Sequence, residues 1–287
     1  MSLARRRKLL PWWFALPGLL WLIVFFAVPI LNQVSVSLMS GDPEVGYDLT
    51  WSFSTYWDAI ADYHEQFLRS IGYAGAATVL ALVIGFPLAY FIAYKAGRYK
   101  GLWLLLVILP FFVSQVMRTA SWQLMLNDDG WIVARMQDVG IVSEDGRFLA
   151  SGKAVVFGLT YNFLPFMVLP LYATLDRIDR RLIEAASDLG ASRATAFRKV
   201  TLPLAIPGIF AGSLLVFIPA CGDYINSSIL GSPNTTMIGN VIQSKFLNVL
   251  DYPTAAALSF ILMGLILLGI AIYGRILGTR QLTELAG

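Results

Sequence analysis

Charged residues are scarce in this 287-residue chain: Asp, Glu, Lys and Arg together make up 14% of it. Soluble domains average about 25% charged residues, and they contain fewer hydrophobic residues than the 57% found here. Such a composition is typical of proteins that cross a membrane several times. It disfavours a soluble enzyme or a nucleic-acid-binding domain, and no nucleic acid partner is expected.

Cysteine and histidine each occur once, as Cys221 and His64. A single cysteine excludes an intrachain disulfide and a thiolate metal cluster, so we interpret Cys221 as a small buried hydrophobic residue. His64 lies in a hydrophilic stretch, where a solvated role is expected. The HExxH and GxSxG motifs are also absent. We therefore predict no metal site and no catalytic residue, and a membrane enzyme is disfavoured.

A nucleotide-binding loop is missing as well. The nearest match is the segment SGKA, which begins at Ser151. Arg147 stands where a phosphate-binding loop needs its first glycine, and Ala154 stands where it needs Ser or Thr. We therefore expect this chain to bind no nucleotide or other cofactor itself.

Long apolar runs dominate what the sequence does contain. A membrane-spanning helix needs about 20 largely apolar residues, and six stretches meet that requirement. These predicted spans are 11–31, 71–94, 102–126, 154–175, 204–226 and 254–275. The first run is too long for a cleaved signal peptide, and no small-residue cleavage site follows it. We interpret it as a retained span.

Lys and Arg residues indicate the orientation of these spans, because cytoplasmic segments are enriched in them. Most of the 21 lie before residue 11, in the 95–101 turn, in the 176–203 loop and in the C-terminal tail. Both termini are therefore predicted to be cytoplasmic, in agreement with an even number of spans.

Acidic residues show the opposite bias. A negative outer face would concentrate cationic solutes, although ordinary solvated loops explain the same pattern.

Four parts make up the predicted organisation. Residues 1–31 form the cytoplasmic N-terminus and first span, and residues 32–69 form an outer loop. Residues 70–275 form a core of five spans that includes the 176–203 loop, and residues 276–287 form a cytoplasmic tail. The outer loop is rich in Trp, Tyr and Phe. Anchoring at the membrane interface explains these aromatic residues, and docking of an outer partner is the alternative.

The predicted cytoplasmic loop before the fifth span is more regular than a solvated connection requires. From Arg180 to Leu189, apolar residues recur on one side of a short helix and charged residues on the other. Gly190 ends that helix, because glycine readily takes a left-handed conformation. Ser192 is the predicted N-cap of a second helix through Lys199. Such a helix pair fits a groove on a soluble partner and, equally, a lipid surface.

This loop resembles the EAA motif of binding-protein-dependent ABC importer permeases. The residues that match the motif at its spacing are Glu184, Ala185, Ala186, Gly190, Ala191, Phe197, Val200, Leu202 and Pro203. Two longer segments, 162–192 and 237–259, resemble permease subunits of spermidine/putrescine importers. The resemblance is clearest from about residue 70 to residue 275.

The resemblance implies an all-α, six-span protein of the bacterial inner membrane, with the type I ABC importer permease (MetI-like) fold. It also implies partners: a second permease subunit in a heterodimer, two ATP-binding subunits that hold the ATP and Mg, and an extracytoplasmic solute-binding protein. By position, Glu184 would pair with an ATPase subunit and Gly190 would set the turn. Ala185, Ala186 and Phe197 would have packing roles.

Polar residues inside the spans are the candidates for contact with a solute, because they are costly in lipid. Asp223 is the only carboxylate within a predicted span core, and a cationic solute would suit it. A loop that begins earlier than the predicted end of the span is the alternative. Arg118 would repel a cation, pair with a carboxylate such as Asp223, or face a partner subunit. The candidate pathway residues are Asp223, Tyr224, Asn162, Tyr161, Trp122 and Arg118.

The sequence thus favours a permease subunit of an ATP-driven importer, with polyamine as the expected substrate class. A permease for another small solute and a self-sufficient secondary transporter are the alternatives. A secondary transporter would need several buried charges for ion coupling, whereas the spans offer only Asp223 and Arg118. Gly208 and Gly212 form a GxxxG pattern, which predicts a close helix contact at the fifth span.

Overall fold

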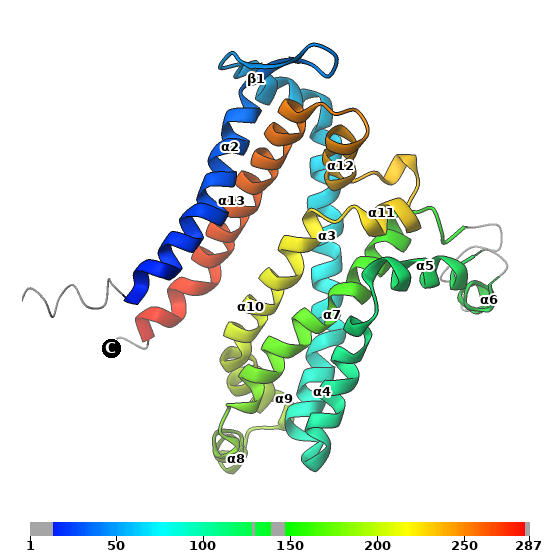
Figure 1. Ribbon diagram of the computed structural model, residues 1–287. Helices are drawn as coiled ribbons and strands as arrows, with labels where there is room; N and C mark the ends of the chain where they lie inside the picture. The colour runs from blue at the N-terminus through cyan, green and yellow to red at the C-terminus, as the bar shows by residue number, and fades with distance from the viewer. Residues whose placement is uncertain (1–13, 128–129, 139–146, 285–287) are drawn as a thin grey trace, which may run out of the picture. The chain divides into compact units, whose positions relative to one another are not determined.

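The computed structural model describes residues 14–127, 130–138 and 147–284, and it is built almost wholly of helices (Figure 1). Within this described part, five helices are long and apolar enough to cross a membrane. A bent helix pair raises the number to six if it counts as one span. These helices overlap all six predicted spans, so the predicted polytopic helical fold is confirmed.

The chain divides into two compact units, and the first comprises residues 1–62 and 242–261. Its first described helix runs from Phe14 to Ser37. A short antiparallel hairpin follows, which the all-α prediction did not include. Asp42 closes the turn of the hairpin, since its Oδ1 accepts the N–H groups of Glu44 and Val45 at 2.9 Å each. The elements here are η1 (Ile23–Ala27), α2 (Val28–Ser37), β1 (Met39–Asp42), β2 (Gly46–Leu49) and the start of α3 (Ser54–Tyr94).

The second unit comprises residues 63–241 and 262–287. Helix α3 enters it at Tyr63, where the backbone leaves the helical conformation with φ −119° and ψ 15°. Like α3, the helices α12 and α13 contribute to both units. The remaining elements are η2 (Gly97–Tyr99), α4 (Lys100–Ile108), η3 (Leu109–Phe112), α5 (Gln115–Met125), α6 (Trp131–Asp138), α7 (Gly152–Asp176), α8 (Arg180–Asp188), α9 (Arg193–Ala196), η4 (Phe197–Thr201), α10 (Leu202–Cys221), α11 (Ile225–Leu230), η5 (Pro233–Thr235), α12 (Ile238–Leu247) and α13 (Tyr252–Glu284).

Helix α7 forms the centre of the second unit, since 61% of its apolar window is buried, more than in any other candidate span. It packs against α10 through the two predicted glycines. A Cβ atom at Gly208 would lie 2.6 Å from Oγ1 of Thr174, and one at Gly212 would lie 2.7 Å from Sδ of Met167. The absence of side chains therefore lets the two helices approach closely, as the GxxxG pattern predicts.

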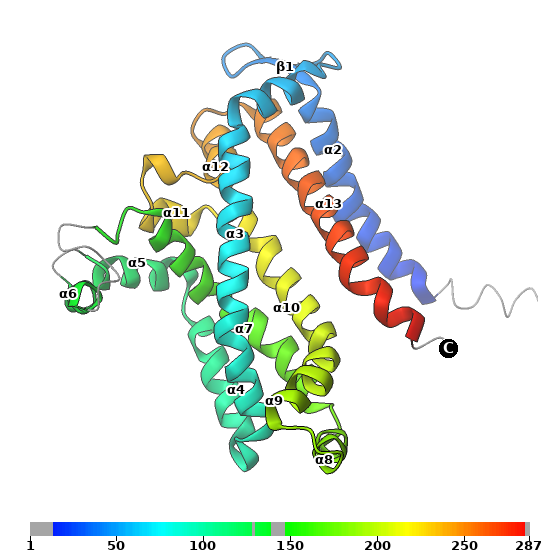
Figure 2. The same ribbon diagram turned by 180° about the vertical axis from the view of Figure 1, so that it is seen from behind.

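The predicted third span, 102–126, is wrong as a single helix. Its two halves, Gly97–Phe112 and Gln115–Met125, meet at an angle of 91° (Figure 2). Pro110 cannot donate a backbone hydrogen bond, and Val113 after it is extended, with ψ 137°. Hydropathy alone did not reveal this break, because apolar residues continue up to the bend.

The predicted fifth span, 204–226, also ends early. Helix α10 ends at Cys221, and α11 begins four residues later. Oδ1 of Asp223 accepts the Asn226 N–H at 2.8 Å and so caps the first turn of α11. Asp223 therefore lies in the turn between two helices, in agreement with the alternative drawn from the sequence.

Candidate functional site

The predicted loop helix is α8, and its N-terminus and that of α9 are both capped by side chains. Oδ1 of Asp179 accepts the Arg181 N–H at 3.0 Å. The hydroxyl of Ser192 accepts the Thr195 N–H at 3.3 Å. The prediction that Ser192 caps a second helix is confirmed.

A Schellman motif ends α8. Gly190 has a φ of +81°, and its N–H donates to the Ser187 carbonyl at 2.9 Å. The N–H of Ala191 donates to the Ala186 carbonyl at 3.0 Å. These are the two bonds of the motif, and the left-handed residue between helix and loop is commonly glycine. The predicted role of Gly190 in setting the turn is therefore confirmed.

The predicted second helix does not stop at Lys199. Helix α9 continues through the π turn η4 into α10, so that Arg193–Cys221 is a single candidate span. The Leu202 N–H donates to the Phe197 carbonyl, five residues earlier. Pro203 cannot donate to Lys199 and would crowd its carbonyl in a regular helix. The wider π turn relieves that conflict and keeps the helix continuous.

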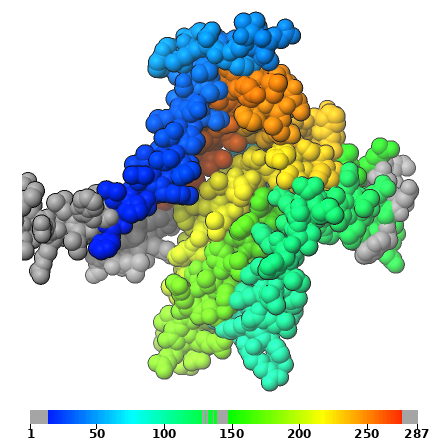
Figure 3. Space-filling view, in the orientation of Figure 1, coloured from blue at the N-terminus to red at the C-terminus, as the bar shows by residue number. Residues whose placement is uncertain are grey.

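One side of α8 is apolar and faces outward. Leu182 is 50% exposed and Leu189 is 89% exposed, and Glu184 and Ala185 are also exposed. The yellow-green surface of this segment lies at the lower end of the second unit in the space-filling view, beside the blue-green surface of α4 (Figure 3). An apolar stripe on a helix is normally buried against a neighbour. Among the described residues of the second unit no neighbour covers this stripe, so it is exposed to a partner protein or a lipid surface.

Contacts with α3 hold α8 and the turn η4 in place. Nη2 of Arg180 donates to the Ala93 carbonyl at 3.5 Å, and its guanidinium lies 5.8 Å from the Tyr94 ring centroid. The Phe197 ring packs edge-on against Phe86 at 5.7 Å and Tyr90 at 6.0 Å. Phe197 therefore packs inside the chain rather than on the outward side of α8.

A buried polar cluster joins α5, α7 and α11 in the same unit. Oδ2 of Asp223 accepts from Nε2 of Gln115 at 2.7 Å, and Oδ1 of Asp223 accepts from Nδ2 of Asn226 at 3.1 Å. Nδ2 of Asn162 donates to Oδ1 of Asn226 at 2.9 Å and to Oγ1 of Thr119 at 3.0 Å. Both oxygens of the Asp223 carboxylate are thus bound to neutral donors of this chain.

The cluster brings together two of the predicted pathway residues, Asp223 and Asn162. Sequence reasoning did not single out Thr119, Gln115 or Asn226 as their partners. The signal for Asn226 was its position three residues after an Asp, which is the spacing of a helix cap. Thr119 and Gln115 gave no comparable signal, since the bend before α5 directs them inward.

We expect Asn226→Ala to lower the stability of the protein by about 1–3 kcal/mol, because it leaves buried partners of Asn226 without hydrogen bonds. A reduced melting temperature in detergent would show this effect. The matched control is Asn234→Ala, at an exposed position of η5, which we expect to leave the melting temperature unchanged. Equal melting temperatures for both variants would contradict a stabilising role for the cluster.

Arg118 lies beside this cluster but does not pair with Asp223. Its guanidinium carbon is 4.9 Å from the Phe111 ring centroid, and its buried Nε has no hydrogen-bond partner. Among the described residues, no carboxylate lies within ion-pair distance of it. Arg118 faces a cavity of about 590 Å³. The cavity is lined by Phe111, Val113, Ser114, Gln115, Arg118, Asn162, Phe163, Phe166, Leu214, Leu215, Ile218 and Pro219.

Four of the six pathway candidates, Asp223, Trp122, Tyr161 and Tyr224, are not among the residues that line this cavity. Trp122 and Tyr161 contact each other edge-on at 5.2 Å, and Trp122 also packs on Phe157 at 4.8 Å. Tyr224 is exposed, and its carbonyl accepts from Nδ2 of Asn240. The structure therefore separates the aromatic candidates from the polar ones.

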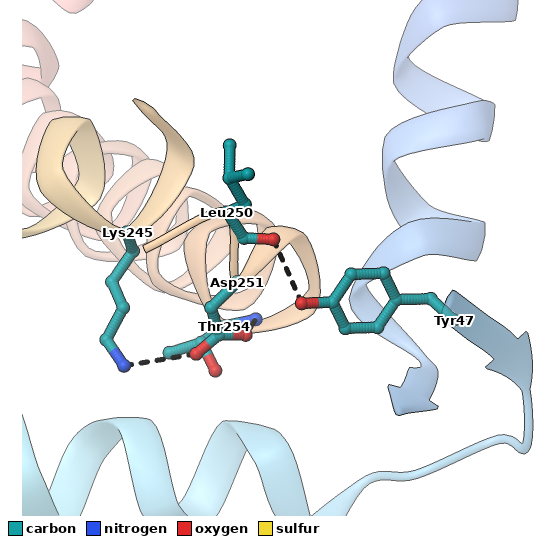
Figure 4. Close-up of polar contacts among 5 residues, drawn as sticks. All are labelled: Tyr47, Lys245, Leu250, Asp251 and Thr254. Carbon is teal, nitrogen blue, oxygen red and sulfur yellow. Dashed lines mark hydrogen bonds and ion pairs between the residues drawn. The ribbon is translucent and has the colours of Figure 1, made fainter. Parts of the chain in front are cut away.

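A second polar site belongs to the first unit (Figure 4). The Tyr47 hydroxyl donates to the Leu250 carbonyl at 2.9 Å, and Nζ of Lys245 pairs with Oδ2 of Asp251 at 3.0 Å. Desolvation raises the pKa of Tyr47, and the nearby carboxylates of Asp251 and Asp42 raise it further. Tyr47 is therefore a neutral donor that ties the hairpin to the turn before α13.

A family profile described as binding-protein-dependent transport system inner membrane component matches residues 10–278. The chain belongs to this family. It is accordingly a transport component of the inner membrane, in keeping with its apolar helices.

The names of several relatives of this inner membrane component include a substrate. It is 36% identical over 252 residues to the spermidine/putrescine transport system permease protein PotB of Escherichia coli, covering 86% of this chain and 92% of that one. It is 37% identical over 256 residues to PotB of Haemophilus influenzae, covering 89% and 90%. An inner membrane ABC transporter permease protein of Escherichia coli, YdcU, is 34% identical over 225 residues, covering 74% and 72%.

Solved structures share the fold of this inner membrane component. A bacterial ABC transporter involved in the import of the acidic polysaccharide alginate matches with a TM-score of 0.62 and 21% identity, covering 94% of this chain and 96% of that one. The alginate transporter in complex with its pentasaccharide-bound periplasmic protein matches with a TM-score of 0.61 and 20% identity, covering 94% of each chain. The fold is that of ABC importer permeases, as the EAA resemblance implied.

Proposed function

We propose that this chain is a permease subunit of an ATP-driven polyamine importer, with spermidine or putrescine as substrate. It forms half of a translocation pathway, and a second permease subunit forms the other half. Two separate ATPase subunits bind the ATP and Mg and grip α8 on the cytoplasmic side, where both termini also lie. An outer solute-binding protein delivers the substrate.

The outward-facing apolar side of α8 is the observation that carries this proposal. A short helix that exposes Leu182 and Leu189 is costly in water, and a groove on a partner protein removes that cost. The helix is anchored to α3 through Arg180 and continues through η4 into α10. Closure of the ATPase subunits therefore moves α8 and the span behind it together, which switches access to the pathway.

The polyamine assignment rests on the substrate named in the relatives at 36–37% identity. The second candidate is an importer of a small solute that is not a polycation. Arg118 favours it, because a cavity that contains an unpaired guanidinium repels ammonium groups.

Transport by the reconstituted complex tests the proposal. The chain is co-expressed with the second permease subunit and the ATPase, purified, and reconstituted into liposomes. Uptake of radiolabelled spermidine is then measured with and without ATP and the binding protein. We expect uptake that needs both, and recovery of the ATPase with the chain. Transport by the chain alone without ATP would contradict the importer assignment, whereas ATP-driven uptake of a different solute would contradict only the polyamine assignment.

A further inference from the structure

Arg118 is a cation inside a membrane protein whose described residues supply no counter-charge for it. Its Nε is buried without a hydrogen-bond partner, and its guanidinium lies over the ring of Phe111. Ionisable residues at such positions are expensive in lipid, and they almost always pair or face a water-filled cavity. Arg118 faces such a cavity, and an anion from outside this chain would neutralise its guanidinium there.

The depth of Arg118 argues against a lipid phosphate as that anion. Phe111 packs edge-on against Phe166 at 5.1 Å, so the guanidinium lies near the level of Phe166 on α7. Phe166 precedes the end of α7 at Asp176 by about 15 Å of helix, which is half of a hydrocarbon core about 30 Å thick. Phe111, which the guanidinium contacts, therefore lies beside the middle of the candidate span Gly152–Asp176 rather than beside either end of it.

The proposed substrate also fails to supply the anion, because a polyamine is cationic. The walls of the cavity instead fit another protein. Among the residues that line the cavity, Val113, Leu215 and Ile218 have exposed apolar side chains. An exposed apolar rim around one polar contact resembles the anatomy of a subunit interface, where a central charged pair is fully desolvated.

We propose that a carboxylate of the second permease subunit enters this cavity and pairs with Arg118. The inference rests on the proposed function for the existence of that subunit. A guanidinium and a carboxylate form two parallel hydrogen bonds, so the pair also fixes how the two subunits are aligned. Arg118 then marks the interface between the permease subunits and does not repel substrate, because its charge is neutralised in the assembled transporter.

Recovery of the second subunit with the full-length tagged chain tests the pair. We expect Arg118→Glu to lower that recovery at least about tenfold, since it places two carboxylates together in a desolvated site. Arg118→Gln leaves the partner's charge unpaired, and we expect it to lower recovery less. The matched control is Arg135→Glu, because the Arg135 side chain is 80% exposed. We expect normal recovery for this control.

Charge reversal in the partner completes the test. Each acidic residue in the spans of the second subunit is changed to Arg, and one of these changes is expected to restore recovery with Arg118→Glu. The corresponding change to Asn or Gln is expected to restore recovery with Arg118→Gln. Wild-type recovery for Arg118→Glu, or a loss that no partner change restores, would overturn the inference while leaving the importer proposal intact. A wild-type chain that recovers no second permease subunit would overturn both.

Discussion

Gly190→Pro is expected to reduce ATP-driven uptake by at least about tenfold while leaving the chain inserted in the membrane. Proline fixes φ near −65°, whereas Gly190 has a φ of +81°. Proline also lacks the N–H that donates to the Ser187 carbonyl. Both losses destroy the Schellman motif and redirect the end of α8, so the apolar side of the helix no longer fits its groove. Uptake by the reconstituted complex measures this effect.

The matched control for this variant is Gly190→Asn, because Asn tolerates the left-handed conformation and keeps the N–H. We expect it to retain most of the uptake and to recover the ATPase normally. Recovery of the ATPase with the Pro variant should fall in parallel with uptake. Equal uptake by the two variants would show that the geometry of this turn does not matter for coupling.

Gly212→Val is expected to lower the yield and the melting temperature of the protein, with a cost of about 1–3 kcal/mol from overpacking. A Cβ at this position would lie 2.7 Å from Sδ of Met167 and 3.2 Å from its carbonyl oxygen. Met167 is fully buried, and its backbone cannot move without displacing α7. The side chain of Met167 can adapt, whereas the backbone contact remains.

Gly264→Val is the control for this prediction, because a Cβ at Gly264 would meet no atom within 4 Å. Both changes place the same β-branched residue in a transmembrane helix, so they share its effect on helix propensity. A thermal melt of the detergent-solubilised protein separates them. A melting temperature for Gly212→Val as high as that for Gly264→Val would mean that α7 and α10 are less closely packed than the structure shows.

The parts of the fold that depend on local sequence were predictable. Hydropathy located the five candidate spans and the bent helix pair, and the Gly190 and Ser192 signals located the end of the first loop helix and the start of the second. Each of these features depends on neighbouring residues alone. The EAA resemblance supplied the family, which the match over residues 10–278 confirms.

The parts of the fold that depend on tertiary contacts could not be predicted from the sequence. From the sequence, a cationic solute or Arg118 was the expected partner of Asp223, yet its carboxylate accepts three hydrogen bonds from Gln115 and Asn226. That arrangement needs the 91° bend before α5, and apolar composition gives no measure of a bend. The pairing of Trp122 with Tyr161, rather than with the polar residues, has the same origin.

The π turn at Phe197–Thr201 joins α9 to α10, so that the whole segment can move as one helix. Arg193–Cys221 is one helical segment of 29 residues, about 44 Å long. It contains no loop that could absorb a movement of one end. One end is the short helix next to α8, and the other end lies two residues before Asp223 and the polar cluster. A tilt of the end near α8 would therefore also move the end near Asp223 and strain the hydrogen bonds of the polar cluster. In the proposed transporter, this helix would therefore connect the binding of ATP at one end with the opening of the path at the other.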